Sequence, residues 1–271
     1  MIKFETIGAD PEFFVLDPKG KPYPATKFAV GSKESPSPIG DGFFEQRDNV
    51  SFEGNIPPVS TKEEFIKNIT RLRQYFIDKV SKFGYSISPN GVEYFEKRYL
   101  LTAEAKEFGC SSVISSWDSY INYLQKRPTP NLGNLKFRVS GFHIHCGYSS
   151  INILKSRGTI DILIGRLFDL FVTMPSHSIK PEPERITTYG KFGMIRCKSY
   201  GVECRTLSTY FTQEDQLSWV WDQVMKIEQF INACDPDDLK YLVKNRHFIG
   251  SSIPGVKRIF NGIFSNLTEG H

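Results

Sequence analysis

Two histidines, His143 and His145, stand one residue apart in a chain that has five histidines among 271 residues. Side chains of a β-strand alternate between its two faces, so these two are expected on the same face. Their apolar neighbours Phe142, Ile144 and Cys146 then fall on the opposite face. Paired imidazoles bind metal ions or phosphate groups. Two structural histidines are the simpler alternative.

Two further stretches repeat this alternation with charged side chains. Asp10 and Glu12 share one strand face, and Glu203 and Arg205 share another, with the apolar Cys204 between them. Three strands that each carry polar residues on one side and apolar residues on the other indicate a sheet with one polar face. We expect that face to be solvated and to bind ligands.

Residues 41–58 form a third acidic region, in which Val50 and Phe52 alternate with polar residues that include Glu53. Residues 21–40 are rich in proline, glycine, serine and lysine, and this composition predicts an irregular loop. Lys33 in that loop is a candidate contact for a phosphate or carboxylate group. A solvated lysine is the alternative.

The apolar periodicity predicts the elements that hold these residues. A capping box at Ser60 and apolar residues every three or four positions as far as Phe83 predict a helix that ends at Gly84. Pro11 predicts an edge strand or a bulge. The other expected elements are short strands over 85–88 and 98–101, helices over 116–126, 156–174, 212–233 and from 235, a central strand over 135–147, a polar loop over 176–192 and strands within 193–207.

Together these patterns predict an α+β fold with a curved, mainly antiparallel sheet, a polar active-site face and helices packed on the other face. We expect a single catalytic domain over 1–271, with a core over about 1–233 and a C-terminal helical extension over about 234–271. The net charge of +4 comes without a run of basic residues, so nucleic-acid binding is not indicated. Five cysteines without a C-x-x-C motif, no signal peptide and no membrane span predict a cytoplasmic protein.

The polar stretches together resemble the phage-type carboxylate–amine ligase family, the COOH-NH2 ligase type 2 group, which is related to the glutamine synthetase and glutamate–cysteine ligase fold. They occur in family order over roughly residues 5–215. The matching stretches are 8–14, 46–50 with Glu53 and Asn55, 141–145, Arg185 with 189–190, and Arg196 with 200–208.

The resemblance implies a glutamine synthetase-like enzyme that uses ATP with Mg²⁺ or Mn²⁺ to convert a carboxylate into an acyl phosphate, which an amine then converts into an amide. Mg²⁺ prefers oxygen ligands, and guanidinium groups match phosphate oxygens. The implied metal ligands are Asp10, Glu12, Asp48, Glu53, His143 and Glu203. The implied cofactor contacts are His145, Lys198 and Lys33, and the implied catalytic arginines are Arg185, Arg196 and Arg205. Gln46 is a further candidate near the metal, and Glu45 is a rival to these acids.

Three other functions are compatible with these residues: a small-molecule kinase on the same fold, a zinc hydrolase built on the two histidines, and a binding protein without catalysis. Zinc is the weaker choice because acids outnumber histidines in the set. The chain has Gly109-Cys110-Ser111-Ser112-Val113 where many relatives have an acidic turn. The resemblance therefore specifies neither the carboxylate and amine substrates, whether small molecules or peptides, nor the oligomeric state. A phage-encoded ligase of this kind is expected in the host cytoplasm.

Overall fold

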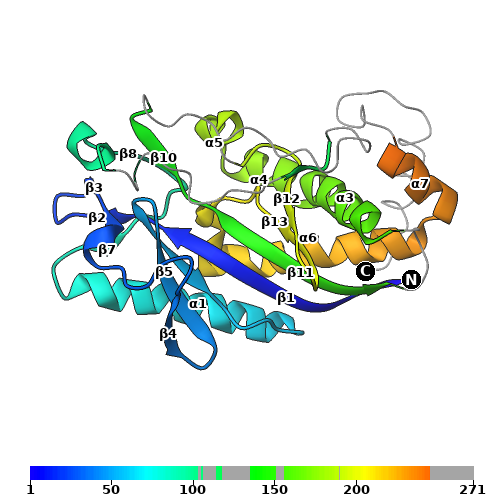
Figure 1. The fold of residues 1–271 in the computed structure, drawn as a ribbon, viewed down its shortest axis with the longest axis horizontal. Helices are drawn as coiled ribbons and strands as arrows, with labels where there is room; N and C mark the ends of the chain where they lie inside the picture. The colour runs from blue at the N-terminus through cyan, green and yellow to red at the C-terminus, as the bar shows by residue number, and fades with distance from the viewer. Residues whose placement is uncertain (103–104, 106–113, 118–134, 151–155, 189, 245–271) are drawn as a thin grey trace.

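A computed structural model of the chain describes residues 1–102, 105, 114–117, 135–150, 156–188 and 190–244. Its largest element is a curved, eight-stranded antiparallel sheet (Figure 1). In spatial order the strands are β4 (Ser37–Gly40), β5 (Phe43–Asp48), β6 (Ser51–Asn55), β1 (Ile2–Phe13), β11 (Phe142–Ser150), β13 (Gly201–Cys204), β12 (Met194–Cys197) and β9 (Ile114–Ser115). This arrangement confirms the predicted α+β fold with its mainly antiparallel sheet.

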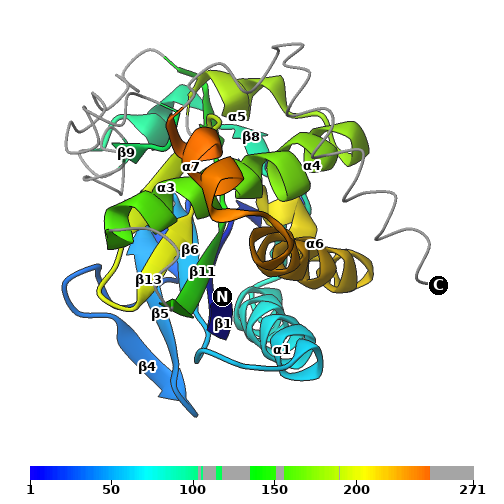
Figure 2. The same cartoon turned by 90° about the vertical axis from the view of Figure 1, so that its right-hand side faces the viewer.

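Helices cover the apolar face of the sheet (Figure 2). The longest are α1 (Lys62–Ser81), α3 (Arg157–Phe168) and α6 (Glu214–Ala233). Shorter ones are α4 (Met174–Ile179), α5 (Pro183–Thr187), α7 (Pro236–Lys244), a π-helical turn (Asp169–Thr173) and 3₁₀ turns at Ala25–Lys27, Lys97–Leu100 and Thr209–Thr212. The predicted helix from residue 235 is thus present as α7, and its Leu239 and Leu242 join the main core.

The first long helix begins one residue later than the sequence predicted. The side chain of Thr61 accepts a hydrogen bond from the amide of Glu64, so Thr61 rather than Ser60 is the N-cap. The buried stripe from Phe65 to Val80 packs on the sheet, where the rings of Phe52 and Phe76 stack 4.6 Å apart. Phe83 was expected in this stripe but is 63% exposed, because the helix has already ended.

The predicted strand over 135–147 is two strands. β10 (Phe137–Val139) pairs with β8 (Val92–Tyr94) in a separate small sheet, and β11 begins only at Phe142. Gly141 lies between the two strands, and a Cβ atom there would lie 2.6 Å from Nε2 of His143. Glycine here lets the backbone pass close to the imidazole.

Three further expectations between residues 21 and 192 were wrong. The 21–40 loop contains β3 (Pro22–Tyr23), which pairs with β2 (Val15–Leu16) beside β7 (Ser86–Ile87), and it contains the edge strand β4. Residues 97–100 form a 3₁₀ turn instead of a strand. The polar loop after residue 176 contains α5, which starts with Pro183 at its first position, a place that favours helix initiation.

Pro11 does not mark an edge strand, because β1 is the fourth strand of the sheet. The register shift of β1 lies between Phe4 and Thr6 rather than at the proline. Proline lacks the backbone N–H group that another residue would donate to the neighbouring strand. Consistent with that loss, β1 pairs with β6 only at Glu12 and Phe13, whereas it pairs with β11 over most of its length.

The predicted helix over 116–126, the Gly109–Ser112 turn and most of the C-terminal extension lie outside the described residues. Within the described part of the chain, every helix is too short or too polar to cross a membrane.

The close approach of β13 to β11 gives a test of the sheet. A Cβ atom at Gly201 would lie 1.9 Å from the carbonyl oxygen of Cys146, and a backbone atom cannot move aside as a side chain can. We expect Gly201→Ala to lower the free energy of unfolding by about 3 kcal/mol or more, measured by urea denaturation. At Gly8 a Cβ atom would make an ordinary 3.4 Å contact with His145. Gly8→Ala should therefore cost much less, and equal losses would contradict the assigned register.

Candidate active site

The antiparallel register brings the polar residues of separate strands into rows on one face of the sheet. Glu12 of β1 lies opposite Glu53 of β6, and Glu53 lies opposite Gln46 of β5. A second row runs from His145 of β11 through Glu203 of β13 to Arg196 of β12. The shared polar face predicted from alternation is therefore present across six strands.

This face is not solvated, contrary to the sequence-based expectation. Glu12 is 3% exposed, His143 and Glu203 are completely buried, and Arg205 is 1% exposed. Buried charges are unfavourable unless they are paired, neutralised or bound to an ion. The partners of each group therefore decide what the site can bind.

The two histidines have different surroundings. His143 lies between two acids, with Nε2 at 3.5 Å from Glu12 and Nδ1 at 3.9 Å from Glu203. Burial, followed by the positive charge of Arg205, holds the pKa of His143 well below its usual value, so its imidazole is neutral at neutral pH.

His145 lies 2.8 Å from the carboxylate of Asp10 through Nε2 and 2.5 Å from the hydroxyl of Tyr200 through Nδ1. Burial would lower the pKa of His145, but the charge and hydrogen bond of Asp10 and the charge of Glu203 outweigh that effect and raise it. The amide of Asn55 donates to the other side of Asp10 at 2.8 Å. Both ring nitrogens of His145 thus have protein partners, although the resemblance implied a phosphate contact.

Three carboxylates, Glu12, Asp48 and Glu53, form what we call the acid end of the face. Gly141 donates its amide to Glu12 at 2.7 Å, and Gln46 donates its side-chain amide to Glu53 at 2.7 Å. Burial and then the charge of Asp48 raise the pKa of Glu12 to about 8 and that of Glu53 to about 7. If all three carboxylates were ionised, they would carry more negative charge than their protein partners offset, and retained protons reduce that charge.

Lys33 reaches the acid end from the long N-terminal loop, with Nζ at 3.1 Å from Asp48 and 3.9 Å from Glu53. Glu45 lies on the apolar side of β5, where Lys79 and the hydroxyl of Tyr75 bind its carboxylate. Glu45 also accepts the amide of Val30 at 2.9 Å and so anchors the loop that carries Lys33. The rival acid is therefore distant from the ligand-binding face and has a structural contact.

Glu203 is surrounded by cations, and we call this group the basic end. Its carboxylate contacts Arg205, Lys198 at 3.0 Å and Arg196 at 3.1 Å. One carboxylate against three cations leaves a net positive charge. Arg205 and Glu203, which share one face of the chain by sequence, thus form an ion pair.

Arg185 forms its hydrogen bonds with the backbone rather than with the carboxylates of the acid end. Its guanidinium donates to the carbonyl oxygens of Ser140, Leu207 and Thr206, and its Nε lies 3.7 Å from Glu182. These bonds fix the chain on both sides of the site, because Ser140 precedes β11 and Leu207 follows β13. Sequence reasoning missed the buried Glu182, whose carboxylate also accepts a hydrogen bond from the amide of Gly91 at 3.0 Å. Its position three residues before Arg185 could have indicated an ion pair between the two side chains.

Asp10, His145 and Glu203 each offer one ligand atom, and these atoms lie within 4.8 Å of one another. Among the described residues this is the group of three acids, histidines or cysteines close enough to hold one metal ion. It contains His145 in place of His143, the histidine that the resemblance implied. Tyr189, which belongs to the family-like stretch 189–190, lies outside the described residues.

Comparison with protein-family models and with curated proteins finds no match to this chain. The family resemblance of the sequence motifs therefore stays a prediction.

The raised pKa values predict that the metal-free protein loses stability as the pH rises from 5 to 9. Glu12 and Glu53 keep protons in the folded state that the unfolded chain releases above about 4.5. Each retained proton makes the free energy of unfolding fall by up to about 1.4 kcal/mol per pH unit, until the pH passes the folded-state pKa. Urea denaturation at a series of pH values measures this slope.

Glu12→Gln removes one of the two retained protons, so its slope should be flatter than that of the wild type, mainly between pH 5 and 8. Glu63→Gln removes an exposed carboxylate of α1, on the other side of the sheet, and serves as the control. Parallel curves for the wild type and Glu12→Gln would show that Glu12 does not hold a proton in the folded state.

Proposed function

We propose that the protein is an ATP-dependent carboxylate–amine ligase that forms an amide or peptide-like bond through an acyl phosphate. One observation carries the proposal: a single buried sheet face has an excess of carboxylates at one end and an excess of cations at the other. Transfer of a phosphoryl group to an acid needs both, since divalent cations and several anionic oxygens must meet in one site.

The donor set fits Mg²⁺ or Mn²⁺. Asp10, His145 and Glu203 present two carboxylates and one imidazole within binding range of each other, at the border with the basic end, where Glu203 also has three cationic partners. Burial and repulsion by neighbouring carboxylates raise the pKa values of Glu12 and Glu53, so these two groups lack sufficient positive charge around them. Bound there, a divalent cation would neutralise phosphate charge and polarise the transferring group.

The basic end fits the phosphates of ATP. Arg196 is partly exposed and Lys198 more so, while Arg205 is buried against Glu203. Guanidinium groups held in place before the reaction stabilise charge that spreads over phosphoryl oxygens in the transition state.

In the proposed reaction the acid attacks the γ-phosphorus and ADP leaves. The amine then attacks the acyl carbon, and phosphate leaves with the oxygen that joined it to the acyl group.

A zinc hydrolase finds less support, because the candidate metal triad contains one histidine and two carboxylates, whereas catalytic zinc sites usually draw on more nitrogen or sulfur ligands. The four described cysteines, at 146, 197, 204 and 234, form no disulfide bond. Cysteines without disulfide bonds are consistent with the reducing cytoplasm that we propose as the location of the protein.

A screen for ADP release tests the function. The protein is incubated with ATP, Mg²⁺ and pooled carboxylic acids with or without pooled amines, and the products are identified by mass spectrometry. We expect ADP and phosphate to form together with an amide, and only when both pools are present. A stable phosphorylated product without an amide would identify a kinase instead, and no nucleotide turnover with any pool would contradict both.

Arg205 gives a sharper test within that reaction. Arg205→Gln should lower kcat by roughly 10²–10³-fold with a smaller effect on the KM for ATP, and Arg205→Lys should recover only part of the rate. Arg166→Lys is the matched control. Arg166 is also buried, but its guanidinium donates to the carbonyl oxygens of Ser116, Leu242 and Val243 on the apolar side. The Arg166→Lys control should lose thermal stability and keep its kcat. A near-normal rate for Arg205→Lys would show that Arg205 serves only in a structural ion pair.

A further inference from the structure

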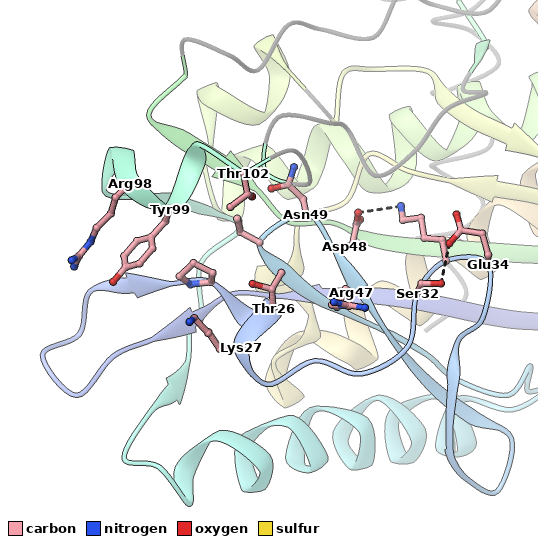
Figure 3. A pocket seen from close by; sticks show the side chains of 13 residues that line it. Thr26, Lys27, Ser32, Glu34, Arg47, Asp48, Asn49, Arg98, Tyr99 and Thr102 are labelled. Atoms are coloured by element: carbon pink, nitrogen blue, oxygen red, sulfur yellow. Dashed lines mark hydrogen bonds and ion pairs between the residues drawn. The ribbon is translucent and has the colours of Figure 1, made fainter.

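A pocket of about 570 Å³ adjoins the acid end of the face. Figure 3 shows Arg98 and Tyr99 toward one end of it and Asp48, Ser32 and Glu34 toward the other, with Thr26 and Asn49 between. Its lining comes from the N-terminal loop, the β5–β6 hairpin and the segment around the Lys97–Leu100 turn. The lining residues are Pro24, Thr26, Lys27, Ser32, Lys33, Glu34, Arg47, Asp48, Asn49, Val50, Arg98, Tyr99 and Thr102.

The loop wall of this pocket is fixed by specific backbone contacts. The amide of Ala25 donates to the carbonyl of Val50 at 2.8 Å, and Nε of Arg47 donates to the carbonyl of Gly31 at 3.1 Å. Gly31 has a φ of 74°, and a Cβ atom there would lie 2.6 Å from the amide of Ser37. The loop is therefore held against the hairpin by a conformation that requires glycine.

The lining carries four cations and two acids, and their partners differ. Lys33 is paired with Asp48, and Arg98 lies 2.9 Å from Glu96 with its guanidinium over the ring of Tyr99. Lys27 and Arg47 form no ion pair with any described residue. The pocket therefore has two positive charges without an acidic partner in the described part of the chain.

The position of the pocket separates it from the basic end. Asp48 lies on β5 and Glu203 on β13, four strand spacings apart, which corresponds to about 19 Å of sheet. Phosphates at the basic end would leave the pocket at the other end of the face for another molecule. Unpaired cations and hydroxyl groups suit an anionic group better than a neutral nucleobase.

We propose that this pocket binds the carboxylic-acid substrate, and that this substrate is a peptide-sized molecule with a second anionic group held by Lys27 and Arg47. The reacting carboxylate would lie near Lys33 and Asp48, beside the acid end; this part rests on the proposed ligase function. A cavity of this volume falls in the range that holds ligands larger than a single small acid.

Isothermal titration without nucleotide tests the pocket. The probes are N-acetylated tripeptides with two glutamate side chains, with one, and with glutamine in place of both, and inorganic phosphate serves as a simple anion. We expect the doubly acidic peptide to bind at least tenfold more tightly than the neutral one and more tightly than phosphate. The double variant Lys27→Gln/Arg47→Gln should lose at least tenfold in affinity for it. Lys67→Gln/Arg71→Gln removes the same charges from α1, where Arg71 pairs with Asp41, and should change the affinity less than twofold.

Equal binding of the acidic and neutral peptides, or an unchanged affinity in the Lys27→Gln/Arg47→Gln variant, would overturn the proposal. Binding of Mg²⁺-ATP is measured on the same proteins with a fluorescent nucleotide. A tenfold loss of nucleotide affinity in that variant would assign the pocket to the nucleotide and also overturn the proposal. Acidic-peptide binding by a protein that does not bind Mg²⁺-ATP would leave the pocket assignment standing and refute the ligase function.

Discussion

The structure depends on how buried charges are balanced on one face of the sheet. At the basic end, Glu203 has three cations around one carboxylate, so its charge is more than offset. At the acid end, Glu12, Asp48 and Glu53 share one lysine, and the chain responds by holding protons on carboxylates that are normally ionised at neutral pH. Protons and divalent cations are alternative ways of balancing that end. A face with opposite imbalances at its two ends suits a reaction that brings divalent cations and phosphates together.

The remaining architecture holds this balance in place. Alternation along each strand sends the charged side chains to one side and the aromatic and aliphatic ones to the other, where α1, α3 and α6 pack. Arg185 fixes the strand ends next to the site through three carbonyl oxygens. Glu45 connects the apolar layer to the N-terminal loop and so sets the position of Lys33. A structural carboxylate thus lies on the opposite side of the sheet from the carboxylates of the candidate site.

The alternation of polar and apolar residues predicted most of the polar face, because this alternation can be recognised within each strand separately. It identified His143, His145, Glu203 and Arg205 as neighbours on that face, and Lys33 as a residue of interest. It failed where the outcome depends on distant parts of the chain. The break before Phe142 coincides with a change of pairing partner, from β8 to β1 and β13, and the burial of the polar face is a property of the whole fold. Three of the partners of Arg185 are backbone carbonyl oxygens, which no side-chain pattern reveals.

The number of protons released when Mg²⁺ binds tests the central claim most directly, because carboxylates must lose their protons to ligate a metal ion. Isothermal titration of the metal-free protein at pH 7, in buffers with different ionisation enthalpies, gives that number. With the pKa of Glu12 near 8 and that of Glu53 near 7, roughly one proton should be released per binding event, and fewer from Glu12→Gln. Tight Mg²⁺ binding without proton release, or release that is unchanged in Glu12→Gln, would contradict an acid end that exchanges protons for a divalent cation.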